Sequence, residues 1–451
     1  MMDWERLFSK DRLEETKTGS ASKTRTTFEV DFDRVVFSSA FRRLQDKTQV
    51  IPLPESDFVH TRLTHSLETS CVGRSLAKKI GTEIIKRHKL GSVSVEDFGS
   101  VVATACLAHD IGNPPFGHSG ESAISNYFRK GPGLRFKGSI APEKWTDLIN
   151  FEGNANGFRI LTNRHNILKG NISLTYSTLA TFTKYPCASF KEGKKHFSRI
   201  HKKYGYFFAE KESFEEIFSS LEVEKNSDGI YSRHPLAYLV EAADDICYRI
   251  IDFEDGIRIG LIPFDEGRDI LRSLLPNEYF KKAKFENIRD RKEQIGYLRS
   301  KVITYLVEES AKIFLDNEKD ILDGNYDKAL LDELRKDKKD VLETIERLSV
   351  SQIYNSRDVV MIEISGFNVV EKLLDMFIIA VNNYYELRDR LRKEDVLSDK
   401  LIDILPKQFL GNDGYPEEDI YSRILQICEF VAGMTDGYAI SLFKRLSGYS
   451  L

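Results

Sequence analysis

The chain has 451 residues, of which 41% are hydrophobic and 30% are charged, a balance typical of a globular protein with a large core. Its 66 Lys and Arg residues against 70 Asp and Glu residues give a net charge of −4, which offers no global signal for nucleic-acid binding. No apolar run reaches the length of a membrane span and the N-terminus has no secretory pattern, so we expect a cytoplasmic protein without membrane contact.

The predicted elements are almost all helical. Only 12 Pro and 28 Gly interrupt the chain, and long stretches repeat apolar residues at helical rather than alternating spacing. In chain order, we predict helices over 66–88, from the N-cap Ser94 to His109, from the N-cap Ser119 to near Arg129, over 235–253 and over 357–390. The charge-rich stretch 281–348 fits solvated faces of packed helices, and loops are expected at 14–27, 130–145, 188–204 and 410–419. The sequence therefore predicts one large all-α domain over 1–451, with few or no strands.

Two histidines and two carboxylates stand in separate motifs that helices can bring together. His109 and Asp110 end one predicted helix. His65 lies near the start of another helix, and Asp244 lies in an acidic patch of a third. Such a mixed nitrogen and oxygen set suits a hard or borderline divalent ion with open positions for water and an oxygen-rich substrate. Because a His-Asp pair is common by chance, a buried histidine hydrogen-bonded near a helix end is the alternative interpretation.

The third of these helices carries a row of polar side chains. Asp244, Tyr248 and Asp252 are spaced four residues apart, so they stack on one helical face. Small and apolar residues flank them, which favours a lined pocket over the alternative of a solvent-facing polar stripe.

A second histidine motif follows the Gly- and Pro-rich loop at 112–117. His118 and Glu121 begin the next helix, three residues apart. Histidine can act as a general acid or base near neutral pH, and a carboxylate one turn away can orient it. The same helix N-terminus favours anions such as phosphate. A surface or capping histidine is the alternative.

Basic residues lie upstream of these motifs. The segment 42–49 begins with two arginines, and Arg62 precedes His65 by one turn. An arginine beside a metal ligand is well suited to bidentate phosphate contact. Surface salt bridging is the alternative for Arg42 and Arg43.

In combination, these motifs resemble the HD superfamily, and within it the deoxyguanosine triphosphate triphosphohydrolase family. The matching stretches cover nearly the whole chain and lie at 41–50, 62–66, 109–121, 184–186, 241–248 and 433–439. The specific signal is the combination of Pro-Pro-Phe-Gly-His-x-x-Glu with Asp-Asp-x-x-x-Tyr. The resemblance implies an all-α HD fold in which 58–255 forms the catalytic core and 256–451 is a C-terminal helical region packed on it.

The resemblance also implies a metal and a catalytic histidine. The metal would be a divalent ion, Mg²⁺ or Mn²⁺, with other transition metals as further candidates. Its ligands would be His65, His109, Asp110 and Asp244. His118 would be the catalytic histidine, supported by Glu121.

By the same resemblance, four other residues would bind the substrate. Tyr248 would block a 2′-hydroxyl, and Asp252 would bind the 3′-hydroxyl of a deoxyribose. Gln45 would lie beside the sugar, and Arg62 beside the triphosphate. The roles of Lys184 and of the 188–204 segment stay open.

The implied reaction is metal-dependent hydrolysis of dGTP, with other dNTPs as further candidates, to deoxynucleoside and inorganic tripolyphosphate. Water would attack the α-phosphorus, and no Walker-type Gly-Lys-Ser/Thr loop suggests γ-phosphate chemistry. Two alternatives remain: an HD phosphohydrolase of nucleoside monophosphates or cyclic nucleotides, and a nucleotide- or single-stranded-DNA-binding regulatory protein with a structural metal. Expected partners are the dNTP substrate, further copies of the chain in a homo-oligomer such as a hexamer, and a single-stranded DNA or nucleotide effector.

Overall fold

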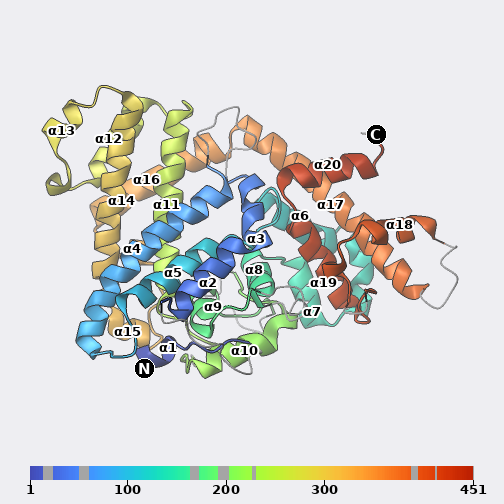
Figure 1. Cartoon of the computed structure of the whole chain (residues 1–451). Coiled ribbons are helices and arrows are strands. Elements are labelled where there is room, and N and C mark those ends of the chain that lie inside the picture. The colour runs from blue at the N-terminus through green and yellow to red at the C-terminus, as the bar shows by residue number, and fades with distance from the viewer. Residues whose placement is uncertain are drawn as a thin grey trace.

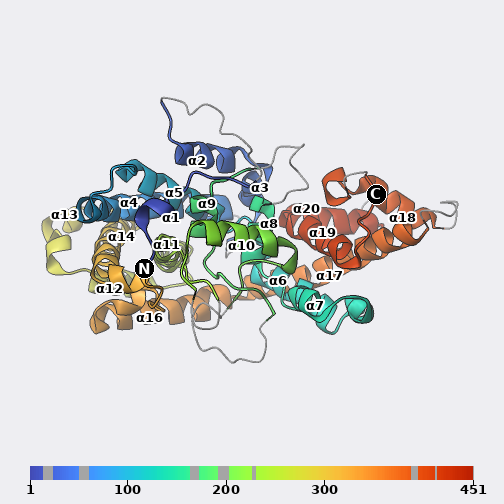
Figure 2. The ribbon, with the colours of Figure 1, turned by 90° about the horizontal axis from the view of Figure 1, so that it is seen from below.

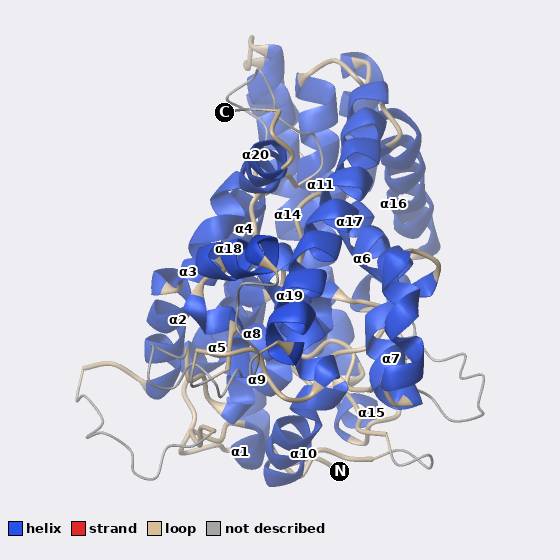
Figure 3. Ribbon diagram, turned by 90° about the vertical axis from the view of Figure 1, so that its right-hand side faces the viewer, coloured by secondary structure: helices blue, strands red, loops and turns tan. Residues whose placement is uncertain are grey.

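The computed structural model describes residues 1–13, 24–49, 60–162, 172–190, 203–225, 230–387, 395–411 and 414–449. Over these residues the regular secondary structure is helical, and β-pairing is limited to isolated bridges such as the one between Thr48 and Thr61. Figure 3 shows helices throughout the described chain. This confirms the all-α prediction.

The α-helices of the N-terminal half are α1 (Trp4–Leu7), α2 (Thr27–Phe37), α3 (Ser39–Arg42), α4 (Arg62–His88), α5 (Val95–Ala108), α6 (His118–Arg129), α7 (Pro142–Ile149), α8 (Gly153–Thr162), α9 (Tyr176–Phe182) and α10 (Lys211–Ser220). Those of the C-terminal half are α11 (Ala237–Arg258), α12 (Phe264–Leu274), α13 (Lys282–Glu286), α14 (Arg291–Asp316), α15 (Glu318–Leu322), α16 (Lys336–Leu348), α17 (Arg357–Glu386), α18 (Val396–Ile404), α19 (Ile420–Ala432) and α20 (Asp436–Leu446). Shorter helical turns are η1 (Arg43–Asp46), η2 (Pro132–Ser139), η5 (Phe208–Glu210), η6 (Asn277–Tyr279), η7 (Leu330–Glu333), η8 (Ser349–Tyr354) and η10 (Lys407–Phe409).

Helix starts follow local capping chemistry. The Ser94 hydroxyl accepts a hydrogen bond from the backbone N–H of Asp97 at 3.1 Å, so Ser94 caps α5 as predicted. Helix α4 begins at Arg62, four residues before the predicted start, because Thr61 and Thr64 form a capping box. The longer α4 places His65 in its first turn.

Two sequence predictions about helix boundaries were wrong, and others lie partly outside the described residues. Helix α6 has Gly117, not Ser119, as its N-cap, because the chain turns there through a φ of +58° that glycine tolerates. The predicted loop at 130–145 contains η2 and the start of α7, since Pro132 and Pro142 begin helices rather than end them. The predicted loops at 14–27 and 188–204, and the end of the 357–390 helix, fall partly outside the described residues.

The helices pack around two hydrophobic cores. The first core contains buried residues of α2, α4, α5, α9, α10, α11, α12, α14 and α16. The second contains buried residues of α6, α7, α17, α18, α19 and α20. Figures 1 and 2 show the two groups side by side, with α12 and α14 at one end of the molecule and α18 and α19 at the other. The loop 111–117 passes between them, because Ile111 belongs to the first core and Phe116 to the second.

Among the described residues, we find no helix with the length and apolar character that crossing a membrane requires.

Candidate active site

Three helices of the first core bring together two imidazoles and a carboxylate. His65 lies in the first turn of α4, His109 at the C-terminal end of α5, and Asp244 in the middle of α11. One potential ligand atom from each lies within 4.8 Å of the others. His65 Nε2 is 3.3 Å and His109 Nε2 is 3.5 Å from the same Asp244 oxygen, Oδ1. We call these three residues the metal cluster, because two imidazole nitrogens and a carboxylate oxygen fit a divalent ion.

The hydrogen bonding of His109 supports this fit. Its Nδ1 lies 2.7 Å from the carbonyl oxygen of Cys106, one turn back along α5. Because a carbonyl oxygen can only accept, Nδ1 carries the proton and Nε2 keeps a lone pair facing Asp244. A metal-binding histidine is commonly held in this way by a carbonyl behind it.

Asp110 lies beside the metal cluster, but both of its oxygens are already engaged. Oδ2 accepts a hydrogen bond from Arg62 Nη1 at 2.6 Å, and Oδ1 accepts one from Asn113 Nδ2 at 2.6 Å. Oδ1 is also 3.5 Å from His109 Nε2. Asp110 is therefore within reach of the cluster, and its role as a fourth ligand stays a prediction.

Positive groups surround the two carboxylates. Burial opposes their charged forms, but the imidazoles together with Arg62 and Lys184 hold the pKa values of Asp110 and Asp244 well below the ordinary range. Lys184 Nζ lies 3.8 Å from Asp244 Oδ2 and 3.7 Å from Glu241. Lys184, whose role the sequence left open, thus lies at the metal cluster.

One and two turns further along α11, Tyr248 and Asp252 meet a residue that the sequence did not single out. Tyr354, at the end of η8, stacks on Tyr248 with ring centroids 5.6 Å apart and planes 22° apart. The Tyr354 hydroxyl donates to Asp252 Oδ2 at 3.2 Å. Burial and the charge of Asp255 raise the pKa of Asp252 to about 7, although His65 opposes the shift. Tyr354 therefore contacts both predicted sugar-binding residues, Tyr248 through its ring and Asp252 through its hydroxyl.

His118 and Glu121 form the predicted pair at the start of α6. His118 Nδ1 is 2.9 Å from Glu121 Oε2, and the imidazole is 82% exposed. The other Glu121 oxygen accepts the backbone N–H of Gly153 at 2.7 Å, which fixes the carboxylate. Burial alone would raise the pKa of Glu121, but the hydrogen bond from His118 and the charge of Lys203 lower it. Lys203 itself is 2.9 Å from Glu152, so a second carboxylate joins this network.

The remaining predicted contact, Gln45, lies exposed on η1. The segment that follows it, residues 47–49, lies beside the start of α4, because the backbone N–H of Arg62 donates to the Lys47 carbonyl at 3.1 Å. Gln45 and Arg62 are therefore on neighbouring segments, while no direct contact with the metal cluster is recorded for Gln45 in the described structure.

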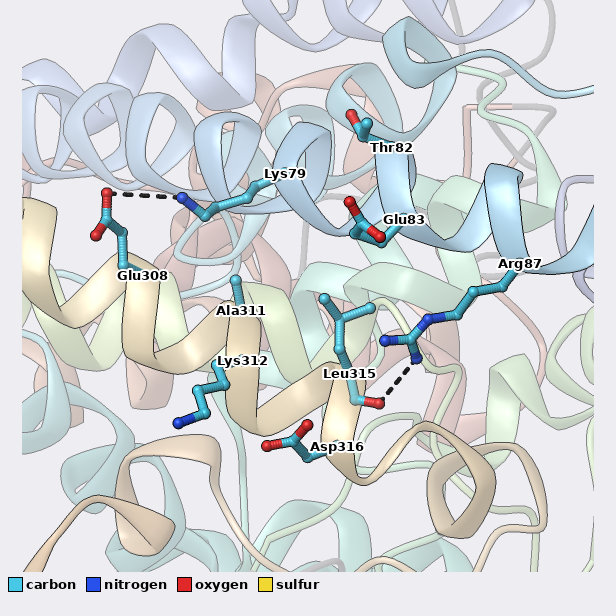
Figure 4. Close-up of a pocket in the computed structure, with 9 residues that line it drawn as sticks. All are labelled: Lys79, Thr82, Glu83, Arg87, Glu308, Ala311, Lys312, Leu315 and Asp316. Carbon is cyan, nitrogen blue, oxygen red and sulfur yellow. Dashed lines mark hydrogen bonds and ion pairs between the residues drawn. The ribbon is translucent and has the colours of Figure 1, made fainter.

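A surface hollow of about 480 Å³ lies elsewhere, between α4 and α14 (Figure 4). Lys79, on its wall, follows His65 by 14 residues, which is about 21 Å along a helix. Two of the charged side chains that line the hollow have partners there: Lys79 pairs with Glu308 at 3.6 Å, and Arg87 donates to the Leu315 carbonyl at 3.0 Å. The hollow is separate from the metal cluster.

Comparison with known proteins identifies a domain that contains His65, His109 and His118. The model of the HD domain matches residues 62–143, which include α4, α5 and α6. The whole chain is 42% identical to a deoxyguanosinetriphosphate triphosphohydrolase-like protein of Synechocystis, with 100% of both chains covered. It is 36% identical to a protein of the same description from Pseudomonas aeruginosa, covering 100% of this chain and 99% of the relative. A deoxyguanosinetriphosphate triphosphohydrolase of Salmonella schwarzengrund is 31% identical over 93% of each chain.

Proposed function

Because the chain belongs to the deoxyguanosinetriphosphate triphosphohydrolase family of HD-domain proteins, we propose that it hydrolyses dGTP and other deoxynucleoside triphosphates. The products would be the deoxynucleoside and inorganic tripolyphosphate. In this reaction a water oxygen bonds to the α-phosphorus, the bond from phosphorus to the 5′-oxygen breaks, and a proton passes to that oxygen.

The observation that carries the proposal is the arrangement of side chains along α11. Asp244 belongs to the metal cluster, and Tyr248 and Asp252 lie one and two turns further on. A nucleotide lying along this face would place its phosphates at the metal cluster and its sugar against Tyr248 and Asp252. Because a helix rises about 6 Å per four residues, Tyr248 and Asp252 lie about 6 Å and about 12 Å along the helix axis from Asp244.

The residues around the metal cluster would have separate roles in the reaction. A divalent ion held by His65, His109 and Asp244, with Asp110 as a candidate fourth ligand, would supply a Lewis acid and an activated water. Lys184 and Arg62 would offset the charge of the triphosphate.

His118 would transfer the proton in this reaction. A carboxylate oxygen only accepts, so the Nδ1 of His118 donates to Glu121 and its Nε2 is left to exchange a proton with the substrate or the water. The charged Glu121 would keep the imidazole oriented through the reaction.

A product assay over a panel of substrates tests the proposal. The purified protein is incubated with each dNTP, with GTP and with dGMP, with Mg²⁺, with Mn²⁺ and with a chelator. We expect tripolyphosphate from dGTP in the presence of metal, and none with the chelator. Release of orthophosphate or pyrophosphate in its place would reject the cleavage site.

The same panel separates the alternatives. Turnover of dGMP or a cyclic nucleotide without turnover of dGTP would favour an HD phosphohydrolase of smaller nucleotides. Binding of nucleotide or single-stranded DNA without any turnover would favour a regulatory protein with a structural metal. The homo-oligomer and the nucleic-acid or nucleotide effector stay predictions, which the mass in solution and the effect of added effector on turnover would test.

A further inference from the structure

The loop between the metal cluster and His118 has an unusual backbone. Phe116 has a φ of +64° and the next residue, Gly117, a φ of +58°. Glycine adopts this conformation readily, but an aromatic residue does so only at a cost in free energy. Such a conformation persists only where the surrounding structure holds it, and it occurs most often at functional sites.

One carboxylate of the last helix holds this loop. Asp436, in the first turn of α20, accepts the backbone N–H of Phe116 with Oδ1 at 3.0 Å. Its Oδ2 accepts the backbone N–H of Thr48, also at 3.0 Å. Asp436 is buried; its bond with Phe116 is buried as well, and its bond with Thr48 is partly buried. The carboxylate therefore joins α20 to two segments that lie 320 and 388 residues before Asp436 in the chain.

A buried lysine reinforces the same junction. Lys47 is 2% exposed, and its ammonium group donates to the carbonyl oxygens of Asn113 at 2.6 Å and Ala432 at 2.8 Å. Burial, together with the charges of Arg43 and Arg62, lowers the pKa of Lys47 to about 7. A buried ammonium group is costly, so its presence here favours a function beyond filling space.

A third contact comes from α17. The ring of Phe116 packs on Gly366, where an added Cβ would lie 2.6 Å from the ring Cγ. Only a residue without a side chain leaves room for the ring at this position. The strained residue is thus held by its backbone from α20 and by its ring from α17.

We propose that Asp436 is a positioning residue, which holds the 111–117 loop in the conformation that places His118 relative to the metal cluster. The role of His118 rests on the proposed function, whereas the clamp itself rests on the contacts above. Asp436 is not needed to start α20, because the Thr435 hydroxyl accepts the backbone N–H of Tyr438 at 3.2 Å and caps that helix. Loss of the Asp436 carboxylate is therefore expected to release the loop while α20 remains formed.

The test combines hydrogen exchange with kinetics on the full-length protein. Asp436→Asn keeps the shape of the side chain but turns one accepting oxygen into an NH₂ group, so one of the two clamp bonds is lost. We expect faster amide exchange in a peptide covering 111–121, and a kcat lower by between about 10- and 100-fold. KM and bound metal are expected to stay close to those of the wild type. Thr435→Ala, the matched control, weakens the cap of α20 and should leave loop exchange and kcat near wild type.

A second variant alters the contact between the loop and α17. Gly366→Ala places a methyl group against the Phe116 ring without touching a polar group or a metal ligand. We expect the same faster loop exchange and the same fall in kcat, which keeps the inference testable if Asp436→Asn does not fold.

The outcomes are separable from those of the proposed function. Unchanged loop exchange in both variants would overturn the clamp, and faster exchange with an unchanged kcat would overturn the positioning role. If the wild-type protein turns over no nucleotide, the proposed function fails and the positioning role of Asp436 fails with it, while the exchange data still decide whether Asp436 holds the loop.

Discussion

At the scale of single residues, Asp244 links the separate parts of the candidate site. Its Oδ1 faces the imidazoles of His65 and His109, while its Oδ2 faces the ammonium group of Lys184. The same side chain would thus bind the metal and orient a cation toward the substrate. A change at Asp244 would alter both functions, so His118 and Tyr248 offer cleaner tests of mechanism.

The first prediction separates proton transfer from metal binding. His118→Ala is expected to retain the metal and the nucleotide affinity but to lose about 10²- to 10⁴-fold in turnover, because His118 lies outside the metal cluster. His109→Ala is expected to lose the metal itself. Metal content and turnover are measured on the same preparations of both variants. A metal-free His118→Ala protein would make His118 a ligand, and a fully active one would remove it from the mechanism.

The second prediction concerns the choice of sugar. Tyr248→Ala is expected to raise the ratio of GTP to dGTP turnover by about tenfold or more, because it removes the ring that would exclude a 2′-hydroxyl. Tyr354→Phe is the matched control: it keeps the ring that stacks on Tyr248 but loses the hydroxyl bonded to Asp252. We expect this control to alter KM and leave the GTP to dGTP ratio unchanged. An unaltered ratio in Tyr248→Ala would count against its role.

The residues of the metal cluster and the His118–Glu121 pair could be selected from the sequence, but the contacts of Tyr354 and Lys184 could not. His65, His109 and Asp244 were selected by motif, and the structure places them together. Tyr354 follows Asp252 by 102 residues and carries no local signal, because its contact depends on how η8 packs against α11. The position of Lys184 beside Asp244 also depends on packing between distant elements.

At the scale of helices, the start of α4 is linked to the end of α11 by the partly buried imidazole of His60. His60 Nδ1 lies 2.6 Å from Asp255 of α11, and its Nε2 lies 3.3 Å from Glu68 of α4. With a carboxylate at each nitrogen, both nitrogens carry protons. Burial opposes the charge, but the two carboxylates raise the pKa of His60 to about 10.

The third prediction follows from that shift. A histidine with a pKa raised from 6.5 to about 10 on folding contributes stability that is fully present below pH 6.5 and is lost as pH rises toward 10. His60→Gln is therefore expected to cost about 2 kcal/mol of unfolding free energy at pH 6, and progressively less between pH 7 and pH 10. Denaturant unfolding of both proteins over this range measures the difference. A difference that does not change with pH would contradict the ionic role.

Helix positions were easier to predict than helix ends. Apolar periodicity identified α4, α11 and α17, because their buried residues recur at helical spacing over many turns. Helix α5 is buried on nearly all sides and was identified by its N-cap and its run of small apolar residues. The start of α6 was misplaced because the backbone of Phe116 and Gly117 is held by contacts with α17 and α20, which are distant in the sequence. Residues 130–145 were misassigned because proline both ends and begins helices.

At the scale of the whole molecule, the candidate site lies where two cores meet. The metal cluster is built from helices of the first core, and His118 begins α6, which packs in the second. The HD match at 62–143 includes neither Asp244 nor Asp436. The segments that complete the site therefore come from parts of the chain that the domain match does not cover.

The division between two cores has a consequence for inactivation by heat, which is the fourth prediction. Parts of a protein with separate cores can loosen at different temperatures. The second core has fewer buried residues than the first, so we expect it to loosen first on warming and to displace His118 while the metal cluster remains intact. Turnover would then vanish at temperatures at which the protein still retains its metal, and it would return on cooling. Following bound metal and turnover along one temperature ramp checks this, and simultaneous loss of the two would show that both cores melt as a single unit.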